Sequence, residues 1–424
     1  MKAKFDLVVI GAGPAGLAAA HAAALTSQSV AVIDDNPRAG GQIWRQGANA
    51  KKPAALSRVL DELISHPNVT FYPATRVSVL EGTHEIIVDS AQQGGISIAF
   101  ARLVIAAGAR ERLLPFDGWT LPGVTGAGGL QALIKGGMPV RGERLILAGS
   151  GPLLIAAFAT ARSAGARVLA VVEQAPSHAI LRFGLSLSAT PSKLGQAMRL
   201  TRGFAGTHYW TDSVLTHALG NERVAAAVIR RAGRDVTLEC DRIGSGYGLV
   251  PNVSLAQMFG CTLARGAVVV DDMQRTSVPD VWAAGECTGI GGMELARAEG
   301  RIAGLAATDQ AVPASLVRER EHWRRFARRV ARAFELGPQA RTRPSAETIV
   351  CRCEDVAFRD VSAHASWRDA KLHTRCGMGP CQGRICGAAL ETYFGWDAAP
   401  PRPPLMPTRI GALLEAREGD DARL

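Results

Sequence analysis

A glycine-rich turn near the start of the chain constrains the fold more than any other feature. The apolar run Phe5–Ile10 is typical of a buried strand, and residues 11–16, GAGPAG, follow it directly. An alanine-rich stretch then predicts a closely packed helix, and Val30–Ile33 predicts a second strand that ends at Asp34. Strand, GxGxxG turn, helix, strand and acidic residue together are typical of a βαβ unit that binds a dinucleotide.

Each residue type in this pattern has a physical reason. Gly11 permits the tight turn, Gly13 lets backbone amides approach a pyrophosphate at the positive end of the helix, and Gly16 lets the helix pack closely on the strand. Asp34 can accept hydrogen bonds from ribose hydroxyls. The pattern therefore predicts an α/β fold with a nucleotide site at the turn.

A second unit of the same kind begins at Arg144. The apolar strand Arg144–Ala148 leads into residues 149–154, GSGPLL, and then into a helix and a strand that ends at Glu173. Leu154 stands where the first unit has its third glycine, and its side chain pushes the helix away from the turn. We expect the fold of this unit to be retained, whereas its ligand stays open between a nicotinamide nucleotide, another nucleotide and none. The candidate residues of this second site are Gly149, Gly151, Pro152 and Glu173.

The C-terminal part of the chain holds most of the cysteines. Five of the eight are Cys351, Cys353, Cys376, Cys381 and Cys386. A secreted disulfide scaffold would be short and rich in cysteine throughout, so one local cluster in a long chain favours a metal site. Four thiolates suit a [2Fe–2S] cluster, with two for each iron. A structural zinc site is the competing interpretation, but zinc pairs usually have the spacing C-x2–4-C, and the first two cysteines of the cluster are closer than that.

Two more segments match the first βαβ unit, and together these pieces carry a resemblance. Residues 102–109 run from an apolar strand into a turn of small residues, and residues 278–286 form a strand that ends in Gly285 and Glu286. Over about residues 5–308 the chain resembles the two-dinucleotide-binding flavoproteins of the thioredoxin reductase and glutathione reductase type. The resemblance implies an FAD-binding domain in two halves, with the second nucleotide domain inserted between them.

This resemblance also assigns the residues that hold FAD. The turn and the acids after the second strand would bind the adenosine half, and Glu286 stands where the family has the aspartate that holds the ribityl chain. The expected FAD-binding residues are Gly11, Gly13, Pro14, Ala15, Gly16, Asp34, Asp35, Gly41, Gln42, Ala107, Gly108, Gly285 and Glu286. The disulfide reductases of this type carry a redox-active CxxC pair, which this stretch of sequence lacks, so thiol–disulfide exchange is disfavoured.

The cysteine module carries a second resemblance. Residues 377–386, GMGPCQGRIC, resemble the [2Fe–2S] domain of bacterioferritin-associated ferredoxins in its appended form. Spacing alone does not choose among the last three cysteines, because both intervals between them have four intervening residues. Related modules often have alanine at position 376, and the resemblance therefore makes that cysteine a bystander. The implied cluster ligands are Cys351, Cys353, Cys381 and Cys386.

A flavoprotein followed by this module resembles the alpha or A subunits of opine oxidases, hydroxyproline dehydrogenases and hydrogen cyanide synthase. In that family a beta or B subunit with its own FAD oxidises the C–N bond of an amino acid, opine or other secondary amine. The chain described here would relay the electrons to a quinone or another acceptor. The implied cofactors are FAD and a [2Fe–2S] cluster. Two further ligands stay open: an FMN at a subunit interface, and NAD(P) or another nucleotide in the second site. A small third subunit also stays open.

Two other functions compete with this interpretation. The second βαβ unit and Glu173 favour a self-contained NAD(P)H-dependent reductase that feeds its own cluster, and a scaffold subunit with structural nucleotide sites is the third alternative. The sequence offers no Ser-His-Asp, Cys-His or paired-carboxylate arrangement for substrate chemistry, so catalytic residues stay unassigned. We therefore expect an FAD-dependent oxidoreductase whose amine substrate reacts on another subunit.

Composition limits the partners and the location. Lysine and arginine outnumber aspartate and glutamate by 48 to 38, but only 5% of residues are aromatic, which argues against nucleic-acid binding. The longest apolar run, between Arg144 and Arg162, is shorter than the roughly 20 residues of a membrane span. We therefore expect a cytoplasmic protein without a transmembrane segment, with peripheral contact at the inner membrane through its complex left open.

The remaining segments complete the predicted organisation. Residues 315–335 predict an amphipathic helix with an arginine-rich face, interpreted as solvated, with a docking surface for an acidic partner as the alternative. Prolines between 400 and 407 predict an extended tail. The predicted domains are 1–120 and 241–312 for the FAD-binding halves, 121–240 for the inserted nucleotide domain, 313–345 for the basic helix and linker, 346–395 for the [2Fe–2S] domain and 396–424 for the tail.

Overall fold

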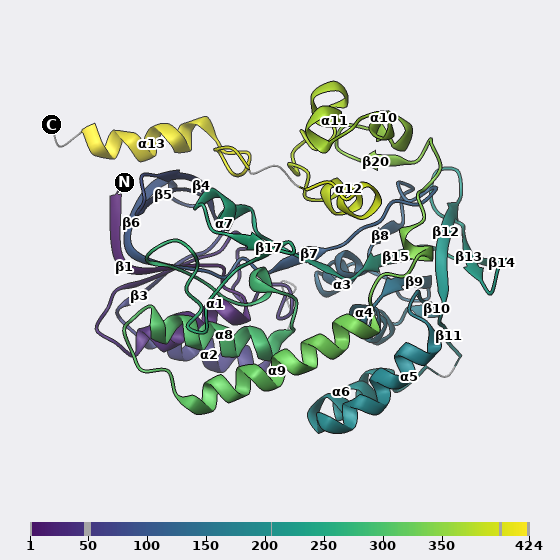
Figure 1. Cartoon of the computed structure of the whole chain (residues 1–424), viewed down its shortest axis with the longest axis horizontal. Coiled ribbons are helices and arrows are strands. Elements are labelled where there is room, and N and C mark those ends of the chain that lie inside the picture. The colour runs from purple at the N-terminus through teal and green to yellow at the C-terminus, as the bar shows by residue number, and fades with distance from the viewer. Residues whose placement is uncertain (1, 46–51, 205, 398–400, 422–424) are drawn as a thin grey trace. The chain divides into compact units, whose positions relative to one another are not determined.

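The computed structural model describes residues 2–45, 52–204, 206–397 and 401–421. The chain folds into two compact units, whose elements are labelled in Figure 1. Unit 1 consists of Met1–Arg110, Val250–Ala327 and Pro400–Leu424, and unit 2 consists of Glu111–Leu249 and Arg328–Ala399. Residues Glu111–Leu249 of unit 2 thus lie in the sequence between two parts of unit 1.

A mostly parallel sheet forms the centre of unit 1. Its strands are β1 (Lys2–Ile10), β2 (Val30–Ile33), β3 (Val69–Tyr72), β4 (Thr75–Glu81), β5 (Glu85–Ser90), β6 (Gly94–Ile105) and β19 (Val281–Ala283). The order is β3-β2-β1-β6-β5-β4, with β19 also paired to β6. Strands β1, β2, β3, β6 and β19 run parallel, so the carboxyl ends of β1 and β2 meet at one edge of the sheet.

Two helices of unit 1 pack unusually closely because glycines face the contact. The helices of this unit are α1 (Pro14–Ala24), α2 (Ala54–Ser65), α7 (Ser254–Met258), α8 (Met293–Ala306) and α13 (Ile410–Asp421), and the short strands β17 (Leu263–Ala264) and β18 (Ala267–Val268) form a separate pair. A Cβ atom on Gly300 would lie 2.1 Å from the carbonyl oxygen of Ala15, and one on Gly304 would lie 2.2 Å from that of Ala19. Helices α1 and α8 therefore run side by side, as Figure 1 shows.

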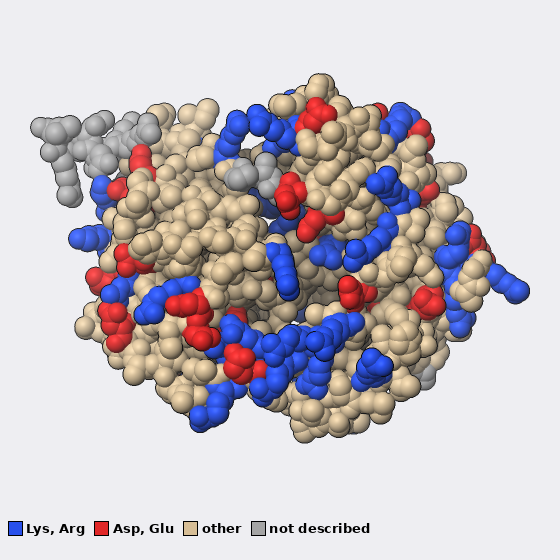
Figure 2. Space-filling model, viewed as in Figure 1, with Lys and Arg blue, Asp and Glu red and all other residues tan. Residues whose placement is uncertain are grey.

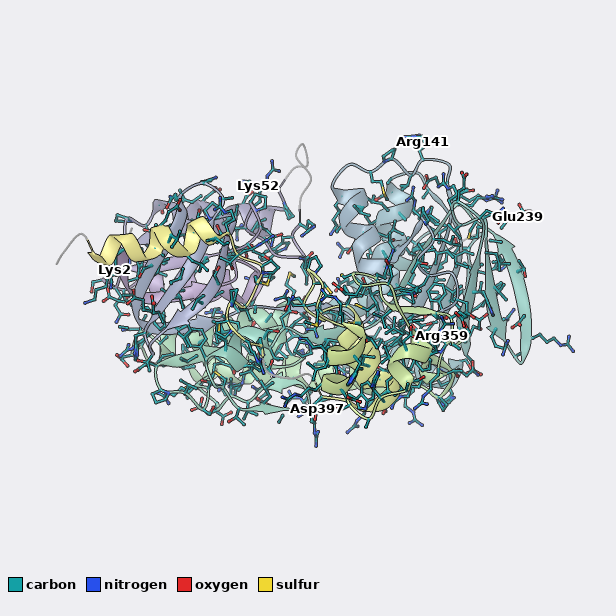
Figure 3. The ribbon with its side chains drawn as sticks, turned by 90° about the horizontal axis from the view of Figure 1, so that it is seen from above. Lys2, Lys52, Arg141, Glu239, Arg359 and Asp397 are labelled. Carbon is teal, nitrogen blue, oxygen red and sulfur yellow. The ribbon has the colours of Figure 1, made fainter. Side chains whose placement is uncertain are left out.

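The C-terminal tail differs from the extended segment that its prolines predict. Helix α13 packs on β5 and β6, and Ala412 and Ala416 of this helix are buried. Gly95 makes room for it, because a Cβ atom there would lie 1.7 Å from the carbonyl oxygen of Ala412. Figure 3 shows the helix beside the end of the sheet that carries Lys2. The expectation of an extended tail over 396–424 is thus wrong for residues 410–421.

Unit 2 contains the second parallel sheet and the cysteine module. The parallel strands lie in the order β11 (His208–Trp210), β10 (Arg167–Glu173), β9 (Arg144–Ser150), β15 (Arg242–Tyr247) and β8 (Val124–Gly126). An antiparallel sheet follows with β12 (Ser213–Leu219), β13 (Ala226–Arg231) and β14 (Arg234–Glu239). The helices of the nucleotide domain are α3 (Ala127–Lys135), α4 (Pro152–Ser163), α5 (Ser177–Ser186) and α6 (Pro191–Thr201).

The cysteine module forms a small layer of its own within unit 2. Its elements are β20 (Ile349–Cys351), β21 (Val356–Ala357), α10 (Phe358–Ser362), α11 (Trp367–Thr374) and α12 (Cys386–Phe394). They share a hydrophobic core that includes Leu114, Val350, Val361 and Leu390. The module is therefore a folded body rather than a loop around the cysteines.

The unit boundaries differ from those expected from sequence. The chain passes between the units at β7 (Ala109–Glu111), at β16 (Leu249–Pro251) and inside α9 (Ala314–Ala333). Residues 111–120 join unit 2 because Phe116 and Trp119 pack into the core of the inserted domain. Sequence patterning places the boundary at 120 because this segment has no regular periodicity.

Helix α9 carries the arginine-rich face that the sequence predicts, and Figure 2 shows Lys and Arg side chains gathered along it. The face is not wholly solvated, because Arg320 is only 2% exposed. Its guanidinium donates to the backbone carbonyl of Asp272 and to the Asp272 carboxylate, the latter at 2.9 Å. The interpretation of a purely solvated face is therefore wrong at this position.

Candidate functional site

A cleft in unit 1 lies at the carboxyl ends of β1 and β2. Most of the residues expected to bind FAD line it: Gly11, Gly13, Pro14, Ala15, Asp34, Asp35, Gly41, Gln42, Ala107, Gly108 and Glu286. The fold thus gathers segments that lie far apart in the sequence around one concave site. Gly16 and Gly285 complete the predicted set but lie behind its wall.

The two glycines behind the wall serve packing. A Cβ atom on Gly16 would lie 1.7 Å from the carbonyl oxygen of Gly11, so a side chain there would push α1 away from the turn. Gly285 has a φ of +78°, and a Cβ atom on it would lie 2.7 Å from the Cβ of Ala15. Both positions therefore set how closely the first glycine turn, α1 and the turn after β19 approach one another.

Gly13 differs from these positions because it faces open space. Its φ is −79°, which any residue adopts, and the nearest neighbour of an added Cβ would be the Cα of Gly41 at 3.8 Å. The protein itself would tolerate a side chain at this position. Because Gly13 has no side chain, its backbone stays accessible to a ligand at the N-terminus of α1. A pyrophosphate requires such access.

The two acids after β2, Asp34 and Asp35, have different environments. The carboxylate of Asp34 accepts a hydrogen bond from the Ala12 amide at 2.5 Å and another from the Asn36 amide at 2.8 Å. It therefore fixes the glycine turn as well as lining the cleft. Desolvation and the neighbouring charge of Asp34 raise the pKa of Asp35. The pair offers carboxylate oxygens where ribose hydroxyls of a bound dinucleotide would lie.

The opposite end of the cleft is formed by the N-terminus of α8. Glu286 is desolvated by burial, which raises its pKa, and its carboxylate accepts a hydrogen bond from the Gly292 amide at 3.2 Å. Gly292 and Met293, which begin this helix, also line the cleft. The helix end thus presents backbone amides and a positive dipole to the cleft, where they favour a negatively charged group.

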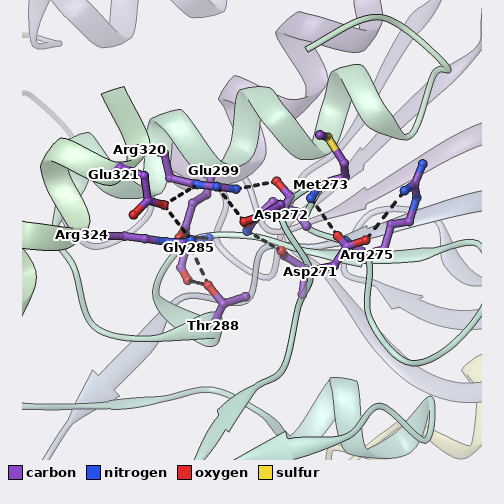
Figure 4. Close-up of polar contacts among 12 residues, drawn as sticks. Asp271, Asp272, Met273, Arg275, Gly285, Thr288, Glu299, Arg320, Glu321 and Arg324 are labelled. Carbon is purple, nitrogen blue, oxygen red and sulfur yellow. Dashed lines mark hydrogen bonds and ion pairs between the residues drawn. The ribbon is translucent and has the colours of Figure 1, made fainter. Parts of the chain in front are cut away.

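A buried network that the sequence did not reveal supports this end of the cleft (Figure 4). The carboxylate of Glu299 accepts hydrogen bonds from the Gly285 amide at 3.1 Å and from the Thr288 hydroxyl at 3.2 Å. Arg324 pairs with Glu299 at 3.5 Å and with Glu321 at 3.0 Å. Helix α9 is thereby tied to the turn that carries Glu286.

Sequence reasoning also missed part of the lining. Thr75, Arg76 and Val77 of β4 line the cleft, as do Asn252, Leu405 and Met406. The side chain of Asn252 donates to the Ala107 carbonyl at 3.0 Å. The Leu405 amide donates to the Ser78 carbonyl at 2.7 Å, which holds the tail against β4. None of these positions belongs to a local motif, so no signal in the sequence singled them out.

The second glycine turn has the geometry of a nucleotide loop. Gly149 has a φ of +139°, Gly151 has a φ of +98°, and Pro152 begins α4. The Gly151 amide donates to the carboxylate of Glu173 at 2.7 Å. Burial raises the pKa of Glu173 to about 7. The four residues expected at this site therefore lie together, in unit 2.

Three buried cysteines of the module form a compact group. The sulfur atoms of Cys351, Cys376 and Cys386 all lie within 4.8 Å of one another. Cys353 is exposed and Cys381 is half-buried, and the backbone and side chain of Cys381 lie close enough to influence the pKa of the Cys353 thiol. The structure thus separates the five cysteines into a buried group of three and an outer pair.

The glycines of the module have a packing reason. Cβ atoms on Gly383 and Gly387 would lie 2.7 Å and 2.6 Å from the indole ring of Trp367. The indole nitrogen of Trp367 donates to the Cys376 carbonyl at 3.3 Å. The Gly377 amide donates to the sulfur of Cys351 at 3.5 Å. Backbone amides and a tryptophan ring thus wrap the buried thiols.

Comparison with known proteins follows the same division of the chain. The family model described as pyridine nucleotide-disulphide oxidoreductase matches residues 5–303. The chain belongs to this family. The A subunit of opine oxidase from Rhizobium meliloti (strain 1021) is 32% identical over 98% of this chain and 99% of its own length. The HcnB subunit of hydrogen cyanide synthase from Pseudomonas aeruginosa is 31% identical over 89% of this chain and 90% of its own length.

As a member of this family and a homologue of those subunits, the chain is an FAD-dependent oxidoreductase. Solved structures show the same fold. L-Proline dehydrogenase from P. horikoshii superimposes with a TM-score of 0.67 at 19% identity, covering 97% of this chain and 80% of that one. Thioredoxin reductase from T. acidophilum has a TM-score of 0.56 at 21% identity and covers 72% of this chain and 98% of that one. The predicted flavoprotein fold is confirmed.

Within the part of the chain that the structure describes, no helix combines the length and the apolar character needed to cross a membrane.

Proposed function

We propose that the chain is the electron-transfer subunit of a heteromeric dehydrogenase or oxidase that acts on the C–N bond of an amino acid, opine or other secondary amine. The substrate would be oxidised on a partner subunit of the beta or B type. The similarity of nearly the whole chain to proteins named as the A subunit of opine oxidase carries the proposal. The cysteine module in unit 2 supports it, because such a subunit needs an outlet for single electrons.

The cleft of unit 1 fits FAD. An open backbone at Gly13, the acids Asp34 and Asp35, and the helix end at Gly292 supply the three features that a pyrophosphate, a ribose and a flavin ring require. Glu286, which accepts a hydrogen bond from the Gly292 amide at this helix end, would hold the ribityl chain. Gly16, Gly285 and Glu299 lie behind the lining and support it, since each one is packed against or bonded to a turn that lines the cleft.

The cysteines fit a [2Fe–2S] cluster of two thiolate pairs. Cys351 and Cys386 form the inner pair and Cys353 and Cys381 the outer pair, which provides two sulfurs for each iron. Cys376 lies with the inner pair and is the fifth, spare thiol of this proposal. FAD takes up two electrons at once and a [2Fe–2S] cluster carries one, so the two cofactors together divide a two-electron oxidation.

The test is to co-express the chain with a candidate FAD-containing partner and purify the complex through a tag on this chain. Flavin and metal analysis should find FAD and about two irons per copy of this chain. Amino acids and opines are then screened with an artificial dye as acceptor, and with a quinone. Recovered FMN or a small third subunit would add to the composition, whereas a complex without iron would contradict the cluster.

The isolated chain provides the control. Its flavin spectrum should not change when amines are added, because the substrate reacts elsewhere. Bleaching of the flavin by an amine in this chain alone would contradict the proposal that a partner oxidises the substrate. Bleaching by NADH or NADPH would instead support the alternative function, a self-contained reductase that feeds its own cluster, which the second nucleotide fold favours.

A further inference from the structure

The second glycine turn is covered by a segment of the chain that lies far away in sequence. In a dinucleotide domain the ligand lies beyond the carboxyl ends of the first two strands, with its pyrophosphate against the turn. In unit 2 these strands are β9 and β10, and the turn is residues 149–151. The residues just after α9, Phe334–Gly337, lie at this place.

Hydrogen bonds hold this segment against the turn. The hydroxyl of Ser150 donates to the Phe334 carbonyl at 3.1 Å. The amide of the Gln174 side chain donates to Ser150 at 2.9 Å and to the Glu335 carbonyl at 3.0 Å. The Gly337 amide donates back to the Gln174 side-chain oxygen at 2.8 Å. Ser150 and Gln174 are both buried, so the bond between their side chains is shielded from water, whereas the bonds to the segment itself are part-buried.

The side chain of Phe334 lies against the glycine turn. A Cβ atom on Gly151 would lie 3.9 Å from the Cβ and ring of Phe334, which places that side chain directly over the turn. The ring also meets Phe183 of α5 edge-on, with ring centroids 5.4 Å apart. The equivalent position in unit 1, Gly13, faces the cleft instead.

Two further anchors keep the segment in place. Arg329 donates to the Ser186 carbonyl and to the Thr190 hydroxyl, the latter at 2.6 Å, which fixes the end of α9 to α5 and the turn after it. Leu336 packs against the core of the cysteine module. The segment is therefore bound on both sides of Phe334 within unit 2.

The acid of the site is also engaged by the protein. One carboxylate oxygen of Glu173 accepts the Gly151 amide at 2.7 Å, and the other accepts the Ala175 amide at 2.9 Å. In a nucleotide-binding turn, backbone amides at the helix end face the phosphates, and the acid faces the ribose. The Gly151 amide and the Glu173 carboxylate bond to each other here, as the Ala12 amide and the Asp34 carboxylate do in unit 1. This contact therefore shapes the turn, and the exclusion of a nucleotide rests on the Phe334 segment.

We propose that Phe334–Gly337 act as a built-in plug that excludes NADH and NADPH from the second nucleotide fold. Phe334 and Gln174 are then specificity-determining residues, since the first covers the turn and the second ties the segment to it. The inference rests on the proposed function in that electrons must reach the flavin from a partner subunit. With the plug in place, NADH and NADPH cannot bind at the second nucleotide fold and donate electrons to the flavin from there.

Fluorescence titration of NADH and NADPH on the purified FAD-loaded chain tests the plug. The wild type should show no saturable binding below about 1 mM. The double variant Gln174→Ala/Phe334→Ala, which loses both the ring and the hydrogen bonds, should bind NADH at least about tenfold more tightly than the wild type. Phe334→Leu is the matched control, because it keeps an apolar cover over the turn and all contacts of Gln174, and it should stay without binding.

FAD content reports folding of unit 1, and the circular dichroism spectrum and thermal melting of each variant report folding of unit 2, which carries the substitutions. Saturable NADH binding by the wild type would overturn the proposal, and this measurement does not depend on any variant. Equal absence of binding in the wild type and in a folded double variant would overturn it too, since the plug would then not be what excludes the nucleotide. Amine oxidation by the complex with its partner is a separate measurement, so a failure of the proposed function is distinguishable.

Discussion

The carboxylate of Glu299 accepts a hydrogen bond from the backbone amide of Gly285 at 3.1 Å. Glu299 lies in α8 and is only 3% exposed, whereas Gly285 precedes Glu286 in the turn at the cleft. The same carboxylate pairs with Arg324 of α9 at 3.5 Å (Figure 4). The position of a cleft-lining acid thus depends on a buried acid that is not itself part of the lining.

Replacing Glu299 should therefore loosen the flavin. Glu299→Ala leaves the Gly285 amide without its acceptor and removes one of the two carboxylates that pair with Arg324. This change should lower the free energy of unfolding by about 1–3 kcal/mol. The variant should also lose FAD during gel filtration. Glu319→Ala is the matched control, because Glu319 pairs with Arg301 only at the surface, at 3.9 Å. That change should cost less than about 1 kcal/mol and leave FAD content unchanged.

A pair of glycines separates binding from folding in the first turn. Gly13→Ala places a methyl group toward the cleft, with its nearest protein neighbour at 3.8 Å, so the chain should fold normally. The methyl group blocks the approach of a pyrophosphate, and FAD should bind at least about tenfold more weakly. Flavin content after purification and the melting temperature measure the two effects. A Gly13→Ala protein with full flavin content would contradict the site.

Gly16→Ala is the comparison, since its Cβ would lie 1.7 Å from the Gly11 carbonyl oxygen. This variant should lose stability as well as flavin, by about 1–3 kcal/mol, because a well-packed interface is overfilled.

These glycines also show what could be predicted from the sequence. The turn at residues 11–16 is recognisable because one local segment contains all of its constraints. The contribution of Leu405 and Met406 to the cleft is not, since it depends on how the tail crosses β4. In the sequence Arg320 resembles any other solvated arginine of α9, and only the position of Asp272 in the folded chain makes it buried.

The cysteine module, too, could be predicted from the sequence only in part. Cysteine spacing predicts a metal site, but not which of the thiols lie together. Cys376 lies with Cys351 and Cys386, and the Trp367 indole donates to the Cys376 carbonyl. Such a contact between side chain and backbone leaves no periodic pattern in the sequence. Gly383 and Gly387 are explained by the same ring.

Burial of Glu173 should make stability depend on pH. Its pKa rises from 4.5 to about 7 because burial disfavours the charged form, although the amides of Ala175 and Gly151 act in the opposite direction. Between these two values the folded chain binds more protons at this site than the unfolded chain, so the contribution to stability is present at pH 4.5 and falls as the pH rises toward 7.

The change is measured against Glu173→Gln, which removes the titration. Over this range the free energy of unfolding of the wild type should fall by about 1–3 kcal/mol relative to the variant. Chemical unfolding at a series of pH values checks the slope rather than the absolute stability, because glutamine also loses one backbone contact. Parallel pH profiles for the two proteins would contradict the raised pKa of Glu173. Glu111, whose pKa burial also raises to about 7, is present in both and cancels.

The cysteine ligands can be assigned by two substitutions. Serine replaces a soft thiolate by a poor iron ligand, so Cys386→Ser should lose most of the iron and of the visible absorption of the cluster. Cys376→Ser should keep both, since the proposed pairs are complete without it, although Cys376 lies within 4.8 Å of two proposed ligands. Cys240→Ser is the control, because Cys240 is a buried thiol in the core of the inserted domain. Iron and acid-labile sulfide are measured in each protein. Loss of iron in Cys376→Ser with retention in Cys386→Ser would move the ligand to Cys376, and equal loss in both would mean that the buried group of three binds as one unit.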